Sequence, residues 1–366
     1  MKSILFAFSL LTANIAFAQT SAPFDNDHWV ISGKMEKETY LGNDCIRLSE
    51  ASIYLKDATF LNGIIEFDMT LPKNRCFPGI GFRLQDKENF EEVYLRPHQL
   101  GNPDAIQYTP VFNGQAAWQL YYGDGYSTAI TYPLNEWVHI KLIIKDTQGE
   151  VYVGNTDKPS LVIHHLKREP KPGQISLENN YPALTRFANF RYTKTNEPAL
   201  QGPFKADVAP KPGTILHWQI SNPFDQKQLE NSFSIPKELN SQLIWKTLPA
   251  ENTGIVNVSQ ITRIGNGSNT VFAKITITSD RDQIKKFQFG FSDAVKLYLN
   301  NRLLYGGQDV FLSRDYRFLG TTGYFDEVYL NLKKGKNELW LAISEDFGGW
   351  GLQGMIPDQT GLTIKP

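Results

Sequence analysis

The sequence lacks a charge excess, and after its first residues it also lacks a long apolar run. Lys and Arg total 37 and Asp and Glu 38, which gives a formal net charge of -1. Because proteins that bind nucleic acid through counterion release carry a basic excess or a basic cluster, no nucleic-acid partner is predicted. No later run approaches the ~18 apolar residues of a membrane helix, so no membrane span is predicted.

Cysteine and histidine are also scarce. Cys45 and Cys76 are the two cysteines, and the sequence leaves open whether they pair or remain buried thiols. Six histidines are scattered, and the neighbours His164 and His165 point to opposite faces of a strand, so no zinc site is predicted. A G-x-S-x-G elbow and a phosphate-binding glycine loop are absent too. Serine-hydrolase and nucleotide-binding chemistry are therefore not indicated.

The first 18 residues have the pattern of a secretory signal. Lys2 supplies the positive end, residues 4–11 form an apolar segment, and Ala16-Phe17-Ala18 forms an A-x-A cleavage site. No cysteine follows this site to carry a lipid. We therefore expect a signal peptide at 1–18 and a mature protein that is secreted or periplasmic.

The remaining chain has the pattern of an all-β protein. Short segments rich in β-branched and aromatic residues alternate with Gly, Pro, Asn and Asp turns, and helical periodicity is hard to find. Such spacing is typical of sandwiches and jelly rolls, and 366 residues suit two domains. Residues 196–213 contain four prolines and few large apolar side chains, as a linker does. We expect β-sandwich domains at 19–195 and 214–366 in tandem.

The segment Tyr94–Tyr122 is unusually dense in planar polar and aromatic side chains. Fork-shaped donors match paired hydroxyls, and flat rings match the apolar faces of sugars. The sequence therefore predicts a carbohydrate-binding site. The predicted ligand-binding residues are Arg83, Tyr94, Arg96, His98, Gln107, Asn113 and Trp118.

Strand alternation suggests which side chains share a face with this segment. In GIIEFDMT, Glu66 and Asp68 point away from the apolar set, and in PGIGFRLQ the side chain of Arg83 lies opposite the apolar residues. If these strands are neighbours, one polar face carries Glu66, Asp68, Arg83, Tyr94, Arg96 and His98 over Gly79 and Gly81. The other interpretation is an ordinary solvated face, with the carboxylates and arginines in a salt-bridge ladder.

These segments carry a family resemblance. FLNGIIEFDMT, GIGFRLQDKENFEEVYLRP and WVHIKLIIKDTQGEVYVG resemble the concanavalin A-like lectin/glucanase superfamily, in particular its laminin G-like and 3-keto-disaccharide hydrolase-type domains, over residues 25–195. The second half, with VKLYLNNRLLY, is similar to galactose-binding-like jelly rolls. The resemblance implies a protein that binds or cleaves glycans.

Catalysis is an alternative to binding. Glucanases of this fold carry E-x-D-x-x-E, but here Glu66 and Asp68 are followed by Leu71 where the second glutamate belongs. The resemblance also suggests elimination from a 3-keto-glycoside, with Glu66, Asp68 or His98 as the base and Arg83 or Arg96 as the stabiliser. A structural adhesion module without a small ligand is the third interpretation.

Two loops leave further alternatives open. Asn102 and Asp104 could supply oxygens to calcium, or they could stabilise an Asx turn; no other cofactor is predicted. The glycine-rich loop 344–355 could display Trp350 for stacking on a sugar, or Trp350 could plug the end of the second sandwich.

Overall fold

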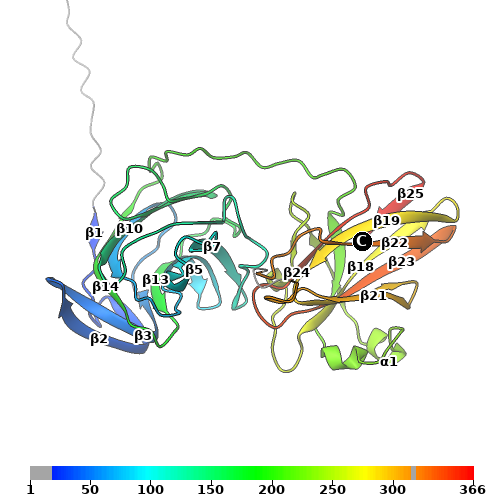
Figure 1. Ribbon diagram of the computed structural model, residues 1–366, viewed down its shortest axis with the longest axis horizontal. Helices are drawn as coiled ribbons and strands as arrows, with labels where there is room; N and C mark the ends of the chain where they lie inside the picture. Colours follow the sequence, from blue (N-terminus) through cyan, green and yellow to red (C-terminus); the bar gives the residue numbers. More distant parts are fainter. Residues whose placement is uncertain (1–18, 315–318) are drawn as a thin grey trace, which may run out of the picture.

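The computed structural model describes residues 19–314 and 319–366, whose regular elements are almost all strands. The prediction of an all-β protein with sandwich-like bodies is confirmed. Figure 1 shows two such bodies side by side, joined by a long extended segment. Of the described helices, none has the length and apolar character needed to cross a membrane. The predicted signal at 1–18 lies outside the described residues.

The first sandwich is formed by a curled antiparallel sheet. Its elements are β1 (Thr20–Ser21), β2 (Trp29–Tyr40), β3 (Asn43–Leu55), β4 (Gly63–Thr70), β5 (Gly79–Asp86), β6 (Asn89–Leu95), η1 (Pro97–Gln99), β7 (Ile106–Phe112), β8 (Gln115–Ala116), β9 (Ser127–Thr128), β10 (Trp137–Lys145), β11 (Gln148–Val153), β12 (Leu161–Ile163), β13 (Gln174–Asn179) and β14 (Thr185–Lys194). The main strand order is β12-β11-β10-β4-β14-β3-β13-β5-β6-β7-β8.

Strand alternation builds the core of this sandwich. On β4 the side chains of Ile65, Phe67 and Met69 are buried in one large cluster, whereas Glu66 and Asp68 point the other way. The same cluster takes side chains from β3, β5, β6, β10 and β14, so the sheet curls around its own apolar face. Burial of these side chains removes apolar area from water, which is the main favourable contribution to folding.

The assumed neighbourhood of β4 and β5 is wrong. Three strands, β14, β3 and β13, lie between them in the sheet. Consecutive strands often pair, but here the chain crosses the sandwich between Thr70 and Gly79 and joins the sheet elsewhere. As a result, Glu66 and Asp68 do not share a strand-to-strand face with Tyr94, and the predicted continuous polar face does not exist.

The second sandwich packs two sheets against each other. Its elements are β15 (His217–Ser221), η2 (Gln226–Leu229), α1 (Lys237–Asn240), β16 (Trp245–Pro249), β17 (Val256–Asn257), η3 (Val258–Gln260), β18 (Thr270–Ser279), β19 (Gln283–Phe291), β20 (Ala294–Leu299), β21 (Arg302–Gln308), β22 (Asp326–Leu332), β23 (Gly335–Ser344), β24 (Gly351–Met355) and β25 (Leu362–Lys365). One sheet has the order β16-β15-β18-β23-β20-β21 with β25 on β18, and the other the order β17-β24-β19-β22.

Local sequence explains two features of this sandwich. Asn300 and Asn301 both have positive φ and join β20 to β21, as an asparagine-rich two-residue hairpin turn requires. Trp350 is fully buried in the core, and its indole Nε1 donates to the Ile343 carbonyl at 3.0 Å. Trp350 therefore fills the end of the sandwich and is not displayed for stacking.

The two cysteines are separate buried thiols. Burial raises the pKa of Cys76 to about 12, so its thiol stays protonated at neutral pH. The question of pairing is thereby answered: these cysteines act as small apolar side chains.

Polar contacts hold the two sandwiches together at the end of the first sheet. The Asn113 amide donates to the Ser259 carbonyl at 2.7 Å, and the Gln119 N–H donates to the Gly348 carbonyl at 2.9 Å. The Glu251 carboxylate accepts from the Tyr121 hydroxyl and from Lys167 Nζ, the latter at 2.6 Å. We call the contact of Glu251 with Tyr121 and Lys167 the junction cluster.

Candidate functional site

Two glycines on β5 lie where the neighbouring strands of the first sandwich approach closely. Gly79 pairs with Tyr94 across β5 and β6, and Gly81 pairs with Glu92. A Cβ atom at Gly79 would lie 2.7 Å from the Tyr94 Cβ, which is closer than packed atoms approach. A Cβ atom at Gly81 would lie 2.3 Å from Ser176 Oγ, so glycine at both positions lets β6 and β13 pack closely against β5.

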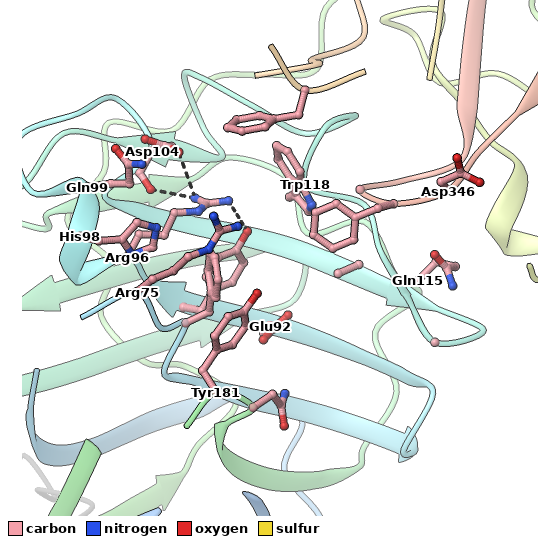
Figure 2. A pocket seen from close by; sticks show the side chains of 18 residues that line it. Arg75, Glu92, Arg96, His98, Gln99, Asp104, Gln115, Trp118, Tyr181 and Asp346 are labelled. Atoms are coloured by element: carbon pink, nitrogen blue, oxygen red, sulfur yellow. Dashed lines mark hydrogen bonds and ion pairs between the residues drawn. The ribbon is translucent and has the colours of Figure 1, made fainter. Parts of the chain in front are cut away.

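A cavity of ≈ 440 Å³ lies beside β6, at the junction of the two sandwiches. Aromatic side chains form much of its wall, and charged and amide groups occupy the gaps between them (Figure 2). The aromatic members are Phe77, Tyr94, Trp118, Tyr181, Phe311 and Phe347. The polar members are Arg75, Glu92, Arg96, His98, Gln99, Asp104, Gln115, Asn180 and Asp346.

Arg96 is fixed in the cavity wall. It follows β6 and is 5% exposed. Its Nη1 donates to the Asp104 carbonyl at 2.7 Å and its Nη2 to the Tyr94 hydroxyl at 2.6 Å, as the dashed lines in Figure 2 show. The guanidinium carbon lies 4.7 Å from the Tyr94 ring centroid and 5.6 Å from that of Trp118. Its orientation is thus set before any ligand arrives.

Gln107 lies beneath the cavity and supports Trp118. Its buried amide donates to the Trp118 carbonyl at 2.8 Å and to the Tyr121 carbonyl at 2.6 Å, and its oxygen accepts from the Tyr94 hydroxyl at 3.3 Å. These bonds anchor the turn that follows β8 and aim the half-buried Trp118 ring at the cavity. Gln107 does not line the cavity, and instead it supports the turn that carries Trp118.

His98 lines the cavity beside Phe77, with ring centroids 5.3 Å apart. Burial and the nearby charges of Arg75 and Arg96 lower its pKa, so its imidazole is neutral at pH 7. Its Nδ1 is buried and has no hydrogen-bond partner among the described residues.

The second sandwich contributes the far wall, which the sequence did not predict. The side chains of Asp346 and Phe347, with Gly348, lie in the loop between β23 and β24 and face the cavity. The rings of Phe347 and Trp118 have centroids 5.8 Å apart. Gly348 and Gly349 have φ of 117° and 128°, which only glycine adopts readily, so the glycine run in this loop was a local indication of an unusual bend.

Arg83 does not reach the cavity. The pairing of β5 with β6 shifts register after Phe82, and Arg83 has a φ of 54°, so the alternation is broken at this bulge. The side chain turns inward, where Nε donates to the Leu61 carbonyl at 2.8 Å and Nη2 to the Asn62 amide oxygen at 2.9 Å. The expectation that Arg83 faces the same side as Tyr94 is wrong, because the bulge reverses its direction.

Asn113 also lies outside the cavity. It follows β7, has a positive φ, and donates across the junction to Ser259. Of the seven predicted ligand-binding residues, the structure gathers Tyr94, Arg96, His98 and Trp118 around the cavity, and it places Arg83, Gln107 and Asn113 elsewhere.

Glu66 and Asp68 belong to a separate surface cluster on β4. His139 on β10 contacts both, with Nδ1 2.7 Å from Asp68 Oδ1 and Nε2 3.4 Å from Glu66 Oε1. Arg191 on β14 donates to Glu66 at 3.1 Å. The cavity contains His98 but neither carboxylate, so the structure does not bring the three predicted catalytic residues together.

The loop before β7 does not offer a calcium cage. The Asp104 carboxylate lies 3.7 Å from Arg96 Nη1, and the Asn102 amide donates to Gln99. The described part of the chain contains no group of three His, Cys, Asp or Glu side chains suited to a metal. The donor set of Asn102 and Asp104 therefore does not fit calcium.

Glu92 and Glu178 lie on the two strands that flank β5, and neither is among the residues predicted for the site. Glu92 lies on β6 opposite Gly81, and Glu178 lies on β13 opposite Gly79. Burial, and then the neighbouring Glu178 charge, raises the pKa of Glu92 well above its ordinary value. Burial also raises the pKa of Glu178, although hydrogen bonds from Ser176 and Asn180 oppose this shift.

Comparison with known proteins gives structural neighbours only. No family model matches the chain, and no curated protein matches it. Similar solved structures include carbohydrate-binding module CBM66 from Bacillus subtilis, with 18% identity, a TM-score of 0.35, and coverage of 46% of this chain and 98% of that one. A β-glucanase from Bacillus licheniformis has 13% identity, a TM-score of 0.33, and coverage of 47% and 94%.

A third similar structure is domain 4 of an extracellular arabinanase from Geobacillus stearothermophilus, in complex with arabinotriose. It has 11% identity, a TM-score of 0.32, and coverage of 46% of this chain and 84% of that one. These neighbours are of the kinds that the sequence resemblance named. At such TM-scores the similarity carries no argument about what this chain does.

Proposed function

We propose that the protein binds a carbohydrate in the cavity between its two sandwiches. The observation that carries this proposal is the Arg96 guanidinium, held in place by Asp104 and Tyr94 beside the face of Trp118. A rigid fork of donors next to an aromatic ring suits adjacent hydroxyls and the apolar face of a sugar. We further propose that the protein acts outside the cell or in the periplasm, because residues 1–18 have the pattern of a secretory signal.

The balance of the cavity supports a hydroxylated ligand over a purely apolar one. Its aromatic members supply stacking faces, and Gln99, Gln115 and Asn180 supply amides that both donate and accept. The Arg96 side chain loses little conformational entropy when a ligand binds, because its hydrogen bonds to protein oxygens already restrict its rotamers. We expect a neutral sugar, because Arg75 and Arg96 line the ligand space together with the carboxyl groups of Glu92, Asp104 and Asp346.

Substitution of Trp118 tests the proposal. A glycan array with the purified protein identifies a bound sugar, and calorimetry then measures its affinity. We expect Trp118→Ala to weaken binding by about 1–3 kcal/mol, on the scale of aromatic stacking measured for other planar ligands. Arg96→Lys keeps the charge but loses the planar fork, and we expect a similar loss.

Tyr329→Ala is the matched control. Tyr329 is 63% exposed on β22 and does not line the cavity, so its removal leaves affinity unchanged. An array on which no glycan binds would refute the proposal and favour an adhesion module. Equal affinities of the wild type and Trp118→Ala would place the sugar elsewhere.

A further inference from the structure

The cavity has two sides of different chemistry. The side formed by the first sandwich carries most of the charged and amide groups, among them Arg96 and Gln99, and Figure 2 shows Asp346 across the cavity from them. Among its described residues, the second sandwich lines the cavity with Phe311, Phe347 and one polar side chain, that of Asp346. A ligand that fills the cavity therefore meets a polar wall on one side and an apolar wall on the other.

The two phenylalanines of the apolar wall are open to water. Phe347, in the loop from β23 to β24, is 62% exposed, and Phe311, in the chain after β21, is 47% exposed. The Phe347 ring approaches that of Trp118, with the ring planes tilted by 57°. Exposed rings beside a cavity favour a ligand that covers them, because apolar area is then removed from water.

The polar groups of the apolar wall already have partners. The Asp346 carboxylate accepts from the Asn269 amide at 3.1 Å. The N–H groups of Asp346 and Phe347 donate to Asp293 at 2.8 Å and 3.2 Å, and the Gly348 carbonyl accepts from a backbone N–H of the first sandwich at 2.9 Å. A second sugar ring placed here would bury hydroxyls beside groups that are already paired, and a buried hydroxyl without a partner is costly. An apolar group carries no such cost.

Trp118 contacts both sides of the cavity. Its ring centroid lies 5.6 Å from the guanidinium carbon of Arg96 and 5.8 Å from the ring centroid of Phe347. A ligand on Trp118 thus has donors on one side and an aromatic ring on the other. The volume of ≈ 440 Å³ lies in the range of about 300–1,000 Å³ that is usual for drug-sized ligands, so it suits a sugar joined to one further ring. A planar ring packs on tilted aromatic side chains with favourable geometry, which a flexible alkyl chain does not.

We propose that the ligand is a glycoside with an aromatic aglycone, whose sugar lies against Arg96 and Trp118 and whose aromatic group lies against Phe347 and Phe311. The proposal rests on carbohydrate binding in the cavity, and it names the class of sugar derivative that the cavity selects. A free sugar leaves the apolar wall exposed to water. We therefore expect a sugar to bind more weakly than its aryl glycoside.

Calorimetry on the full chain with matched probes tests this preference. The probes are the methyl, phenyl and hexyl glycosides, in both anomeric forms, of glucose, galactose, mannose and every other monosaccharide present in a glycan that the array shows to bind. Phenyl and hexyl groups have equal numbers of carbon atoms, so they distinguish an aromatic site from a merely apolar one. For at least one sugar, we expect the phenyl glycoside to bind about tenfold more tightly than the methyl glycoside, because part of one ring is buried. It should also bind more tightly than the hexyl glycoside.

Substitutions in the apolar wall locate the preference. We expect Phe347→Ala and Phe311→Ala each to reduce the phenyl advantage about threefold and the double variant to remove it, while the methyl glycoside keeps its affinity. Phe347→Tyr retains a ring and should retain the advantage. Phe233→Ala is the matched control, because Phe233 is 78% exposed in the second sandwich and does not line the cavity. It should bind every probe as the wild type does.

The outcomes separate this proposal from carbohydrate binding itself. Equal affinities for methyl and phenyl glycosides would overturn the aromatic aglycone and leave carbohydrate recognition intact. A phenyl advantage that survives in the double variant, or an equal gain from the hexyl group, would overturn it as well. If no glycoside of the panel and no glycan of the array binds, both proposals fail together.

Discussion

His139 illustrates how one side chain can decide the role of two others. Its ring nitrogens contact Glu66 and Asp68 on the strand beside it, so the two carboxylates have a structural partner. The hydrogen bond with Asp68 raises the pKa of His139 above its ordinary value, although burial opposes this shift. The cluster thus resembles the predicted salt-bridge ladder, but with a histidine from β10 and Arg191 in place of Arg83 and Arg96.

We predict a pH-dependent contribution of His139 to stability. Since its pKa is raised by folding, its stabilisation is fully present below pH 6.5 and is lost as pH rises through the folded-state pKa. The cluster is partly exposed, so the effect is about 1 kcal/mol or less. Urea unfolding of the wild type and His139→Gln at pH 6 and pH 9 measures it, and their difference in unfolding free energy should shrink at pH 9. A difference that is constant with pH, or equal to that of His165→Gln, would contradict the prediction.

At the scale of elements, the loop from β23 to β24 carries the far wall of the cavity, and a buried acid holds it. Glu345 is fully buried, and its Oε1 accepts from the Gly349 N–H at 3.2 Å. Burial, and then the nearby Asp293 charge, raises the pKa of Glu345 to about 8. Asp293 in turn accepts from the N–H groups of Asp346 and Phe347. Ionisation of Glu345 therefore places two carboxylates together behind the cavity wall.

We predict that this loop loosens in alkaline solution. Because the folded-state pKa of Glu345 is raised, its stabilisation is present below about pH 4.5 and is lost as pH rises through about 8. Glu345→Gln stays neutral, so its advantage in unfolding free energy over the wild type should grow by about 4 kcal/mol between pH 5 and pH 9. Denaturant titrations check this, with Glu338→Gln on the surface as the control. A difference in unfolding free energy that is the same at pH 5 and pH 9 would show that Glu345 is not the titrating group.

Prediction from sequence was right for some strands of this fold and wrong for others. Alternation correctly placed Glu66 and Asp68 opposite the core side of β4, and it placed Tyr94 over the glycines of β5, since both depend on the local period of two. It failed at Arg83, where an inserted bulge shifts the period, and at the strand order, which depends on contacts between segments far apart in sequence. Glu178 escaped notice for the same reason, because β13 is distant in sequence from β5 and β6.

At the scale of the whole molecule, the cavity requires both halves of the chain. We propose that residues 19–195 and 214–366 fold as domains joined by 196–213, and the junction cluster is the polar contact that would keep them aligned. Lys167 lies over the rings of Tyr121 and Tyr126 and pairs with Glu251. Burial lowers the pKa of Lys167, but the charges of Glu251 and Tyr126 and the hydrogen bonds to them together outweigh burial and raise the pKa. The lysine thus depends on a carboxylate from the other sandwich.

Substitution of Glu251 should disturb the cavity, although Glu251 does not line it. Glu251→Ala leaves Lys167 partly buried without its counter-charge, which should cost about 1–3 kcal/mol of unfolding free energy, less than a fully buried pair because water screens both groups. The glycan affinity should fall as well, since Asp346 and Phe347 reach the cavity only while the sandwiches stay aligned. Calorimetry on Glu251→Ala, Lys167→Met and the double variant measures both effects, and a double variant close to Lys167→Met alone would confirm the coupling.

Asp358→Ala is the control for this prediction. It breaks an ion pair with Lys285 inside the second sandwich and should leave affinity unchanged. If Glu251→Ala binds the glycan as tightly as the wild type, the wall from the second sandwich contributes nothing to binding.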